Sequence, residues 1–307
     1  SDFGNRPPEA RQARFVTSPD AFLALWDQTR ELARERPNVR LGAGIHSLRA
    51  ASLDDVRRIV AAIDERVPLP PYDPAEEDAP VPDTPLHIHI SEQRREVAAC
   101  RAKHLGTPIE LLGNAVELGP RWSLVHATHA TPAELLSIAT SGAVVVLCPS
   151  TEANLGDGIF PAHDFSKQRG RIAIGSDSGV TLNVAEELRW FEYVQRLATG
   201  FRHVMDPRPK FGRPLGEALY ERATSAGMQA LDQPIGVIAE DCRADLIVLE
   251  PFEDEPALDI YLFRSGAWQV RDVIAGGRIV VREGRHVDSE ELQRRGAQAV
   301  RALLERV

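Results

Sequence analysis

Four short polar runs, each at the end of an apolar stretch, constrain the fold of this chain more than any other feature. They are His46-Ser47-Leu48-Arg49, His89-Ile90-Ser91-Glu92, His126-Ala127-Thr128-His129 and Ser176-Asp177-Ser178. The stretches before them (residues 39–45, 86–90, 123–125 and 172–175) read as buried strands. Polar groups at the carboxyl ends of successive buried strands are how a (β/α) barrel builds its active site. The order of these runs therefore predicts an α/β fold with its site at one end of the strands.

The pattern between residues 39 and 200 is an alternation of strands and helices. With the apolar run at residues 143–147, five strands are predicted there. Such alternation predicts βαβ units and a parallel sheet. After residue 215 the pattern changes to a helix at 215–230, strands at 244–249 and 270–274, and a final amphipathic helix at 289–306. Gly276-Gly277 predicts a hairpin turn between residues 270–274 and 278–281.

Composition excludes several kinds of partner and location. The 307 residues carry a net charge of −9 with no basic cluster, which argues against nucleic acid and anionic membranes as partners. No apolar run reaches the ~20 residues of a membrane helix, and residues 1–8 lack a signal-peptide pattern. The three cysteines are far apart and odd in number, which indicates reduced thiols. We expect a cytoplasmic protein with a small-molecule substrate.

His89 and Glu92 stand three residues apart at the end of a predicted strand. The His89 side chain would point inward, with Glu92 in the loop above. A neutral imidazole is a good zinc ligand, and a nearby glutamate can transfer a proton. The alternative for His89 is a buried histidine satisfied by hydrogen bonds. His87 shares the face of His89 but lies one layer deeper, so we predict a structural role for His87.

The other strand ends add further candidates. His126 could be a second ligand or an electrophile that polarises a bound substrate, and Asp177 could take a proton from metal-activated water. The alternative for Asp177 is a loop aspartate that caps a helix. Arg49 and His46 follow the first strand, and arginine is the natural bidentate partner of a carboxylate, which predicts an anionic substrate. The alternative for Arg49 is a loop salt bridge.

Taken in order, these motifs resemble the amidohydrolase superfamily, within its group of aromatic and amidine deaminases. The resemblance rests on His89-x-x-Glu92, Val125-His126, the segment 148–158 and Gly175-Ser176-Asp177-Ser178. Residues 236–240 and 244–249 resemble the return into the small β-sandwich of that superfamily. The resemblance implies a (β/α)8 TIM barrel of the metal-dependent hydrolase type.

The resemblance also implies a role for each candidate residue. One zinc ion would be held by His89 and Asp177, and Asp177 would accept the proton of the attacking hydroxide. Glu92 would move a proton to departing ammonia, and His126 would stabilise the developing charge. His46 and Arg49 would bind the carboxylates of a small acidic substrate.

One part of the superfamily pattern is not found. Its first barrel strand ends in His-x-His, whereas the only His-x-His of this chain is His87-Ile88-His89. We therefore expect barrel strands 4–8 without strands 1–3, in a chain that lacks the N-terminal third of the pattern. The expected division is a partial TIM-barrel catalytic domain at 1–230, part of a small β-sandwich at 231–285 and a C-terminal helix at 286–307.

Three functional hypotheses stay open. The first is a zinc-dependent hydrolase of linear amidines, with doubtful activity for the 307 residues alone because two protein ligands are fewer than a catalytic zinc normally has. The second is another deaminase of the superfamily, acting on a guanine-like or adenosine-like substrate. The third is a non-catalytic fragment. We also expect a homodimer.

Overall fold

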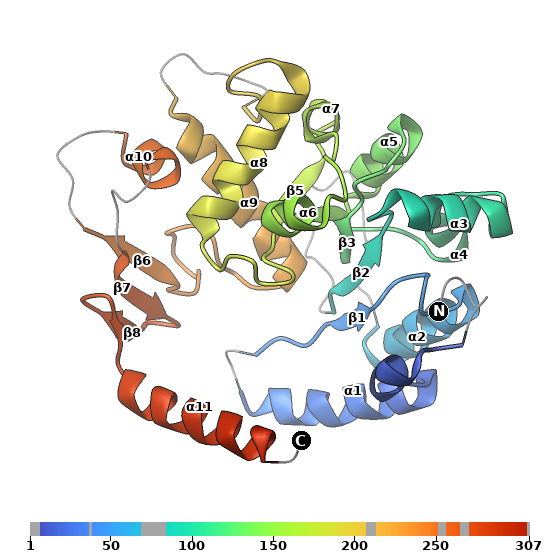
Figure 1. The fold of residues 1–307 in the computed structure, drawn as a ribbon, viewed down its shortest axis with the longest axis horizontal. Helices are drawn as coiled ribbons and strands as arrows, with labels where there is room; N and C mark the ends of the chain where they lie inside the picture. The colour runs from blue at the N-terminus through green and yellow to red at the C-terminus, as the bar shows by residue number, and fades with distance from the viewer. Residues whose placement is uncertain are drawn as a thin grey trace.

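The computed structural model describes residues 7–36, 39–68, 84–206, 213–250, 256–264 and 270–305 (Figure 1). The described residues form two sheets. One is parallel and five-stranded, with helices packed around it, and the other is antiparallel and four-stranded. The α/β class and the parallel sheet predicted from the sequence are confirmed.

The five parallel strands follow one another in chain order across the sheet. They are β1 (Ala43–Ile45), β2 (Leu86–Ile90), β3 (Trp122–His126), β4 (Val144–Leu147) and β5 (Arg171–Ile174). Because neighbours in the sheet are also neighbours in sequence, all five carboxyl ends lie at one edge. The numbering of these strands as 4–8 of a barrel, with three absent, is not confirmed by the sheet and stays a prediction.

Helices connect the strands and cover the sheet. They are α1 (Pro19–Arg34), α2 (Leu53–Arg66), α3 (Arg94–His104), α4 (Pro108–Ala115), α5 (Pro132–Ser141), α6 (Pro149–Leu155), α7 (Ala162–Lys167), α8 (Val184–Thr199), α9 (Leu215–Leu231), α10 (Ala257–Phe263) and α11 (Ser289–Leu304), with a 3₁₀ helix at Ala10–Phe15. Local sequence explains several starts: Ser52, Thr107 and Thr131 each accept a hydrogen bond from the first turn of the following helix. Proline occupies the first turn of α4 and α5, where it needs no hydrogen-bond partner.

The two sides of the parallel sheet have different neighbours. On one side Leu86, Ile88 and Ile90 belong to the main hydrophobic core. The other side carries His87 and His89, and there α9 packs its alanines against β4 and β5. Nε2 of His87 lies 2.8 Å from the carbonyl oxygen of Ala230 in α9, which supports the structural role predicted for His87. Helix α9 therefore covers the part of this side around His87, and His89 lies two residues closer to the carboxyl end of β2.

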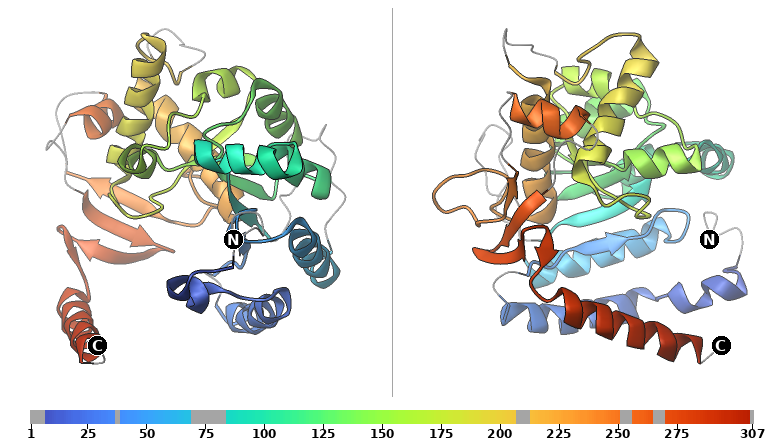
Figure 2. Two further views of the ribbon diagram at one scale, coloured as in Figure 1. Left: turned by 45° about the vertical axis from the view of Figure 1, so that its right-hand side comes forward. Right: turned by 60° about the vertical axis from the view of Figure 1, so that its left-hand side comes forward.

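The second sheet follows α9 in the chain. Its strands β6 (Leu246–Leu249), β7 (Val270–Ala275), β8 (Arg278–Arg282) and β9 (Arg285–His286) pair antiparallel in chain order. The hairpin predicted at Gly276-Gly277 is confirmed, with φ values of 55° and 78° that glycine adopts easily. Beyond it α11 extends from this sheet and has no buried residue (Figure 2). The predicted domain boundaries are not tested by these features and stay predictions.

Among the helices that the sequence did not predict are the 3₁₀ helix Ala10–Phe15 and α6, a seven-residue helix in segment 148–158 with proline in its first turn. None of the helices in the described ranges combines the length and the apolar character that crossing a membrane requires.

Candidate metal centre

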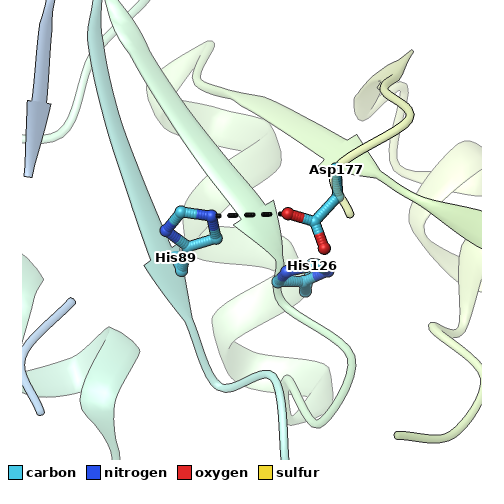
Figure 3. A group of neighbouring side chains, drawn as sticks. All are labelled: His89, His126 and Asp177. Atoms are coloured by element: carbon cyan, nitrogen blue, oxygen red, sulfur yellow. Dashed lines mark ion pairs between the residues drawn. The ribbon is translucent and has the colours of Figure 1, made fainter. Parts of the chain in front are cut away.

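The carboxyl ends of β2, β3 and β5 bring three predicted site residues together. His89 lies on β2, His126 ends β3, and Asp177 follows β5 (Figure 3). One possible ligand atom from each of the three lies within 4.8 Å of the others. Nε2 of His89 is 3.9 Å from Oδ1 of Asp177. The family resemblance implied His89 and Asp177 as a ligand pair, and the structure places the His126 side chain, considered as a second ligand, in the same group.

The backbone is strained where these side chains leave the sheet. The φ angles of His126, Ala127 and Asp177 are 71°, 48° and 42°, and that of Ser91 after β2 is 48°. Residues other than glycine reach this left-handed region at a cost of about 1–3 kcal/mol each, and such residues gather at functional sites. The strain aims side chains from the ends of different strands at one point.

The main chain of β1 orients His89. Nδ1 of His89 lies 2.8 Å from the carbonyl oxygen of His46, which can only accept a hydrogen bond. Nδ1 therefore carries a proton, and in the neutral ring the lone pair is on Nε2, which faces Asp177. A backbone carbonyl that fixes the tautomer in this way is typical of metal-binding histidines. The sequence predicted a role only for the His46 side chain, because a backbone group leaves no signal in residue identity.

His126 is held by a carboxylate that the sequence analysis did not single out. Its ring is 1% exposed, and Nδ1 lies 3.2 Å from Oε1 of Glu152 in α6. Burial lowers the pKa of His126, but the hydrogen bond and charge of Glu152, with the charges of Glu92 and Asp177, outweigh it and raise that pKa above its usual value. The neighbouring carboxylates thus favour protonation of the His126 ring relative to an isolated imidazole.

Arg49 and Glu92 meet beside this cluster. Nη2 of Arg49 lies 2.6 Å from Oε2 of Glu92, and both side chains are largely buried. The backbone N–H groups of Ser91 and Glu92 donate to the carboxylate of Glu96, which holds the loop in place. Nε of Arg49 is buried without a hydrogen-bond partner in the described chain. The loop salt bridge considered as the alternative for Arg49 is therefore present, and an unused donor remains beside it.

The His46 side chain also lies near this edge of the sheet. Its ring centroid is 5.7 Å from that of His89, and Nδ1 is 2.8 Å from the hydroxyl oxygen of Ser47. Burial and the nearby His89 and Arg49 lower the pKa of His46, which favours the neutral ring. All six residues predicted for the site thus lie at the carboxyl edge of the sheet, although their individual roles stay predictions.

Helix α6 supports the loop that carries Asp177. The hydroxyl of Thr151 lies 3.2 Å from the carbonyl oxygen of Ser176 and 3.0 Å from the hydroxyl oxygen of Ser178. Thr151 and Glu152 are adjacent, so one turn of helix contacts both His126 and the Asp177 loop. In the sequence, segment 148–158 contributed only to the family resemblance, and it carries no sign of which side chains are buried there.

The donor set of the cluster fits zinc. Zinc prefers imidazole nitrogen and carboxylate oxygen, and catalytic sites usually have three protein ligands with one position open. His89, His126 and Asp177 supply two imidazoles and one carboxylate, and His89 already has the tautomer that a ligand needs. The expected count of two protein ligands therefore becomes three possible donors in the described chain.

Comparison with known proteins agrees with this geometry. The model of the amidohydrolase family matches residues 22–280. The chain is 44% identical over 312 residues to the formimidoylglutamate deiminase of Pseudomonas aeruginosa, which is 99% of this chain and 64% of that protein. The crystal structure of an amidohydrolase from Brucella melitensis matches with a TM-score of 0.85 and 32% identity, over 98% of this chain and 64% of that one. An adenosine deaminase from Xanthomonas campestris with bound zinc shares the fold, with a TM-score of 0.77 and 22% identity over 94% of this chain and 62% of that one.

These lengths correct one expectation. We expected the chain to lack the N-terminal third of the family pattern. For the 307 residues themselves that expectation is wrong, because the match covers 99% of this chain. The chain spans 64% of the length of the deiminase it matches. The family model spans most of the chain, including every strand of the parallel sheet and the three candidate ligands. This chain belongs to the amidohydrolase family.

Proposed function

We propose that the protein hydrolyses N-formimino-L-glutamate to N-formyl-L-glutamate and ammonia, a reaction of histidine degradation, with one zinc ion. The observation that carries the proposal is the Arg49–Glu92 pair beside His89, His126 and Asp177. It combines a cation for an acidic substrate with groups that can transfer protons. The name of the Pseudomonas aeruginosa relative, formimidoylglutamate deiminase, supports the same substrate.

His89 and Asp177 would hold the ion, with His126 close enough to be a further ligand or a hydrogen-bond donor to the substrate. A bound divalent cation supplies water of lowered pKa, and so a nucleophile near neutral pH. The substrate is held by its carboxylates at Arg49 and His46, which orients the formimino group toward the carboxyl edge of the sheet. Proximity of this kind lowers the barrier by fixing the reacting groups in advance.

Two carboxylates then move the protons. As the oxygen of water bonds to the formimino carbon, Asp177 accepts one water proton at its carboxylate. Glu92 takes the second proton from the new hydroxyl and delivers it to the terminal nitrogen, and Asp177 passes its proton to the same nitrogen, because an amidine nitrogen leaves poorly until it is protonated. The carbon–nitrogen bond then breaks, the carbonyl of the product forms, and ammonia departs. When its ring is cationic, His126 also donates from Nε2, and this donation stabilises the negative charge that develops on the oxygen.

A substrate panel tests the proposal. Ammonia release is measured for N-formimino-L-glutamate, adenosine and guanine, with purified zinc-loaded protein and its Asp177→Asn variant. We expect turnover of N-formimino-L-glutamate only, lost in the variant. Turnover of only a nucleobase or nucleoside would instead favour the second hypothesis, for which the adenosine deaminase of the same fold gives a precedent.

A zinc titration of the 307-residue chain tests the third hypothesis. Binding that depends on His89 and Asp177 would support a functional centre, whereas absence of binding and of ammonia release would favour a non-catalytic fragment. The expected cytoplasmic location, homodimer and lack of nucleic-acid or membrane partners stay predictions.

A further inference from the structure

Glu152 is a buried carboxylate outside the six residues predicted for the site. It lies in the first turn of α6, is 6% exposed, and belongs to a helix that starts directly after the end of β4. Its Oε1 atom has two neighbours: the backbone nitrogen of Cys148 at 2.9 Å and Nδ1 of His126 at 3.2 Å. A charged group with this burial needs partners, and these two hydrogen bonds provide them.

The direction of the hydrogen bonds fixes the proton on His126. The N–H of Cys148 can only donate, so Oε1 of Glu152 is an acceptor. Nδ1 of His126 must then be the donor in the second contact, and in the neutral ring Nε2 keeps the lone pair. Nδ1 and Nε2 lie on different sides of the ring, so anchoring Nδ1 leaves Nε2 for the side shared with His89 and Asp177.

We propose that Glu152 is a positioning residue that holds the His126 ring with its proton on Nδ1, so that Nε2 serves the site. This proposal rests on the proposed function only because that function gives His126 a role in the site. Mutation of a carboxylate that orients a histidine in this way typically lowers metal affinity or activity about 10–100-fold.

The surroundings of α6 make this arrangement rigid. The backbone N–H and hydroxyl of Ser150 donate to Glu187 of α8, at 3.0 and 2.5 Å. Thr151 contacts the carbonyl of Ser176 and the hydroxyl of Ser178, on either side of Asp177. Glu152 therefore acts from a short helix that is fixed both to the scaffold and to the loop of the neighbouring site residue.

A purely structural role makes a different prediction. If Glu152 only satisfied the N–H of Cys148, its removal would lower stability without changing the tautomer of His126. The discriminating measurement is the nitrogen-15 spectrum of the imidazoles in the metal-free, full 307-residue chain, at a pH where His126 is neutral. His126 is assigned by the signal lost in a His126→Gln variant.

Three variants complete the design. Glu152→Gln keeps an Oε1 acceptor that Cys148 orients, so it folds and retains the Nδ1–H tautomer. Glu152→Ala removes the acceptor, and we expect His126 to shift to the Nε2–H tautomer. Glu134→Gln is the matched control, because Glu134 is a buried carboxylate that caps α5 instead of contacting His126. It should leave the His126 signal unchanged.

Kinetics give a second readout. With N-formimino-L-glutamate, kcat of Glu152→Ala should fall about 10–100-fold with little change in KM, and Glu152→Gln should lose less. An Nε2–H signal in the wild-type chain, or the same tautomer in wild type and Glu152→Ala, would overturn the proposal. If Glu152→Ala loses the Nδ1–H signal but the wild-type protein has no deiminase activity, the proposal for Glu152 stands. Only the proposed function would then be rejected.

Discussion

Nη2 of Arg49 lies 2.6 Å from Oε2 of Glu92, although 43 residues separate them in the chain. The pair joins the residue expected to bind a substrate carboxylate with the residue expected to carry a proton. A substrate carboxylate arriving at Arg49 would compete with Glu92 for the guanidinium, so binding and proton transfer would be linked through this contact.

The first prediction concerns that link. Arg49→Met should raise KM strongly and should also lower kcat, because Glu92 loses its partner. In unfolding experiments on Arg49→Met, Glu92→Gln and the double variant, we expect a coupling free energy of about 1–3 kcal/mol, as for hydrogen bonds to charged groups. Additive effects of the two substitutions on the free energy of unfolding would mean that the pair does not form in solution.

The second prediction contrasts two histidines on one face of β2. His89→Ala should lower zinc affinity at least about tenfold. Mutation of a residue that only hydrogen-bonds to a metal ligand already lowers metal affinity by about that factor. His87→Ala loses the hydrogen bond to Ala230 and should lower the free energy of unfolding by about 1 kcal/mol without changing zinc affinity. Isothermal titration with zinc and urea unfolding separate the two effects. Equal zinc affinity in wild type and His89→Ala would remove His89 from the site.

The contrast between β2 and α6 explains what the sequence could predict. The strand β2 and its polar end were found because an apolar run and the two-residue alternation of side chains are local properties. Parallel pairing then brings strand ends to one edge, so His89 and Asp177 could be expected at the same edge of the sheet. That much needs only the chain order of the elements, whereas their pairing as ligands of one ion came from the family resemblance.

The missed features depend on contacts between distant residues. Glu152 was not identified because α6 is short and its segment contains proline and glycine, and its burial comes from tertiary packing. The carbonyl of His46 could not be identified because every residue has the same backbone group. The Arg49–Glu92 pair needs a distance between loops, which strand order does not supply.

The third prediction concerns the pH dependence of stability. Cys100 is fully buried, and burial raises the pKa of its thiol from 9.0 to about 12. The thiol of the unfolded chain loses its proton at a lower pH than the buried thiol. The free energy of unfolding is therefore unaffected by Cys100 below about pH 9 and falls as pH rises toward 12, by up to about 1.4 kcal/mol per pH unit. Urea unfolding of metal-free protein between pH 8 and about 11 should therefore show a shallower decline in Cys100→Ala than in wild type. An equal decline in wild type and Cys100→Ala would mean that the Cys100 thiol does not carry this pH dependence.

The final prediction concerns the loop after α6. Gly158 has a φ of 126°, and a Cβ atom there would lie 3.2 Å from Cε1 of His129 and 3.3 Å from Cγ2 of Thr128. Gly158→Ala should therefore lower the free energy of unfolding by about 1–3 kcal/mol through backbone strain and crowding. Gly296→Ala, in the exposed helix α11 with no atom within 4 Å of the added carbon, should instead raise it by about 0.5–1 kcal/mol. Chemical unfolding of both variants checks the opposite signs, and an unchanged Gly158→Ala protein would mean that the loop does not hold this conformation in solution.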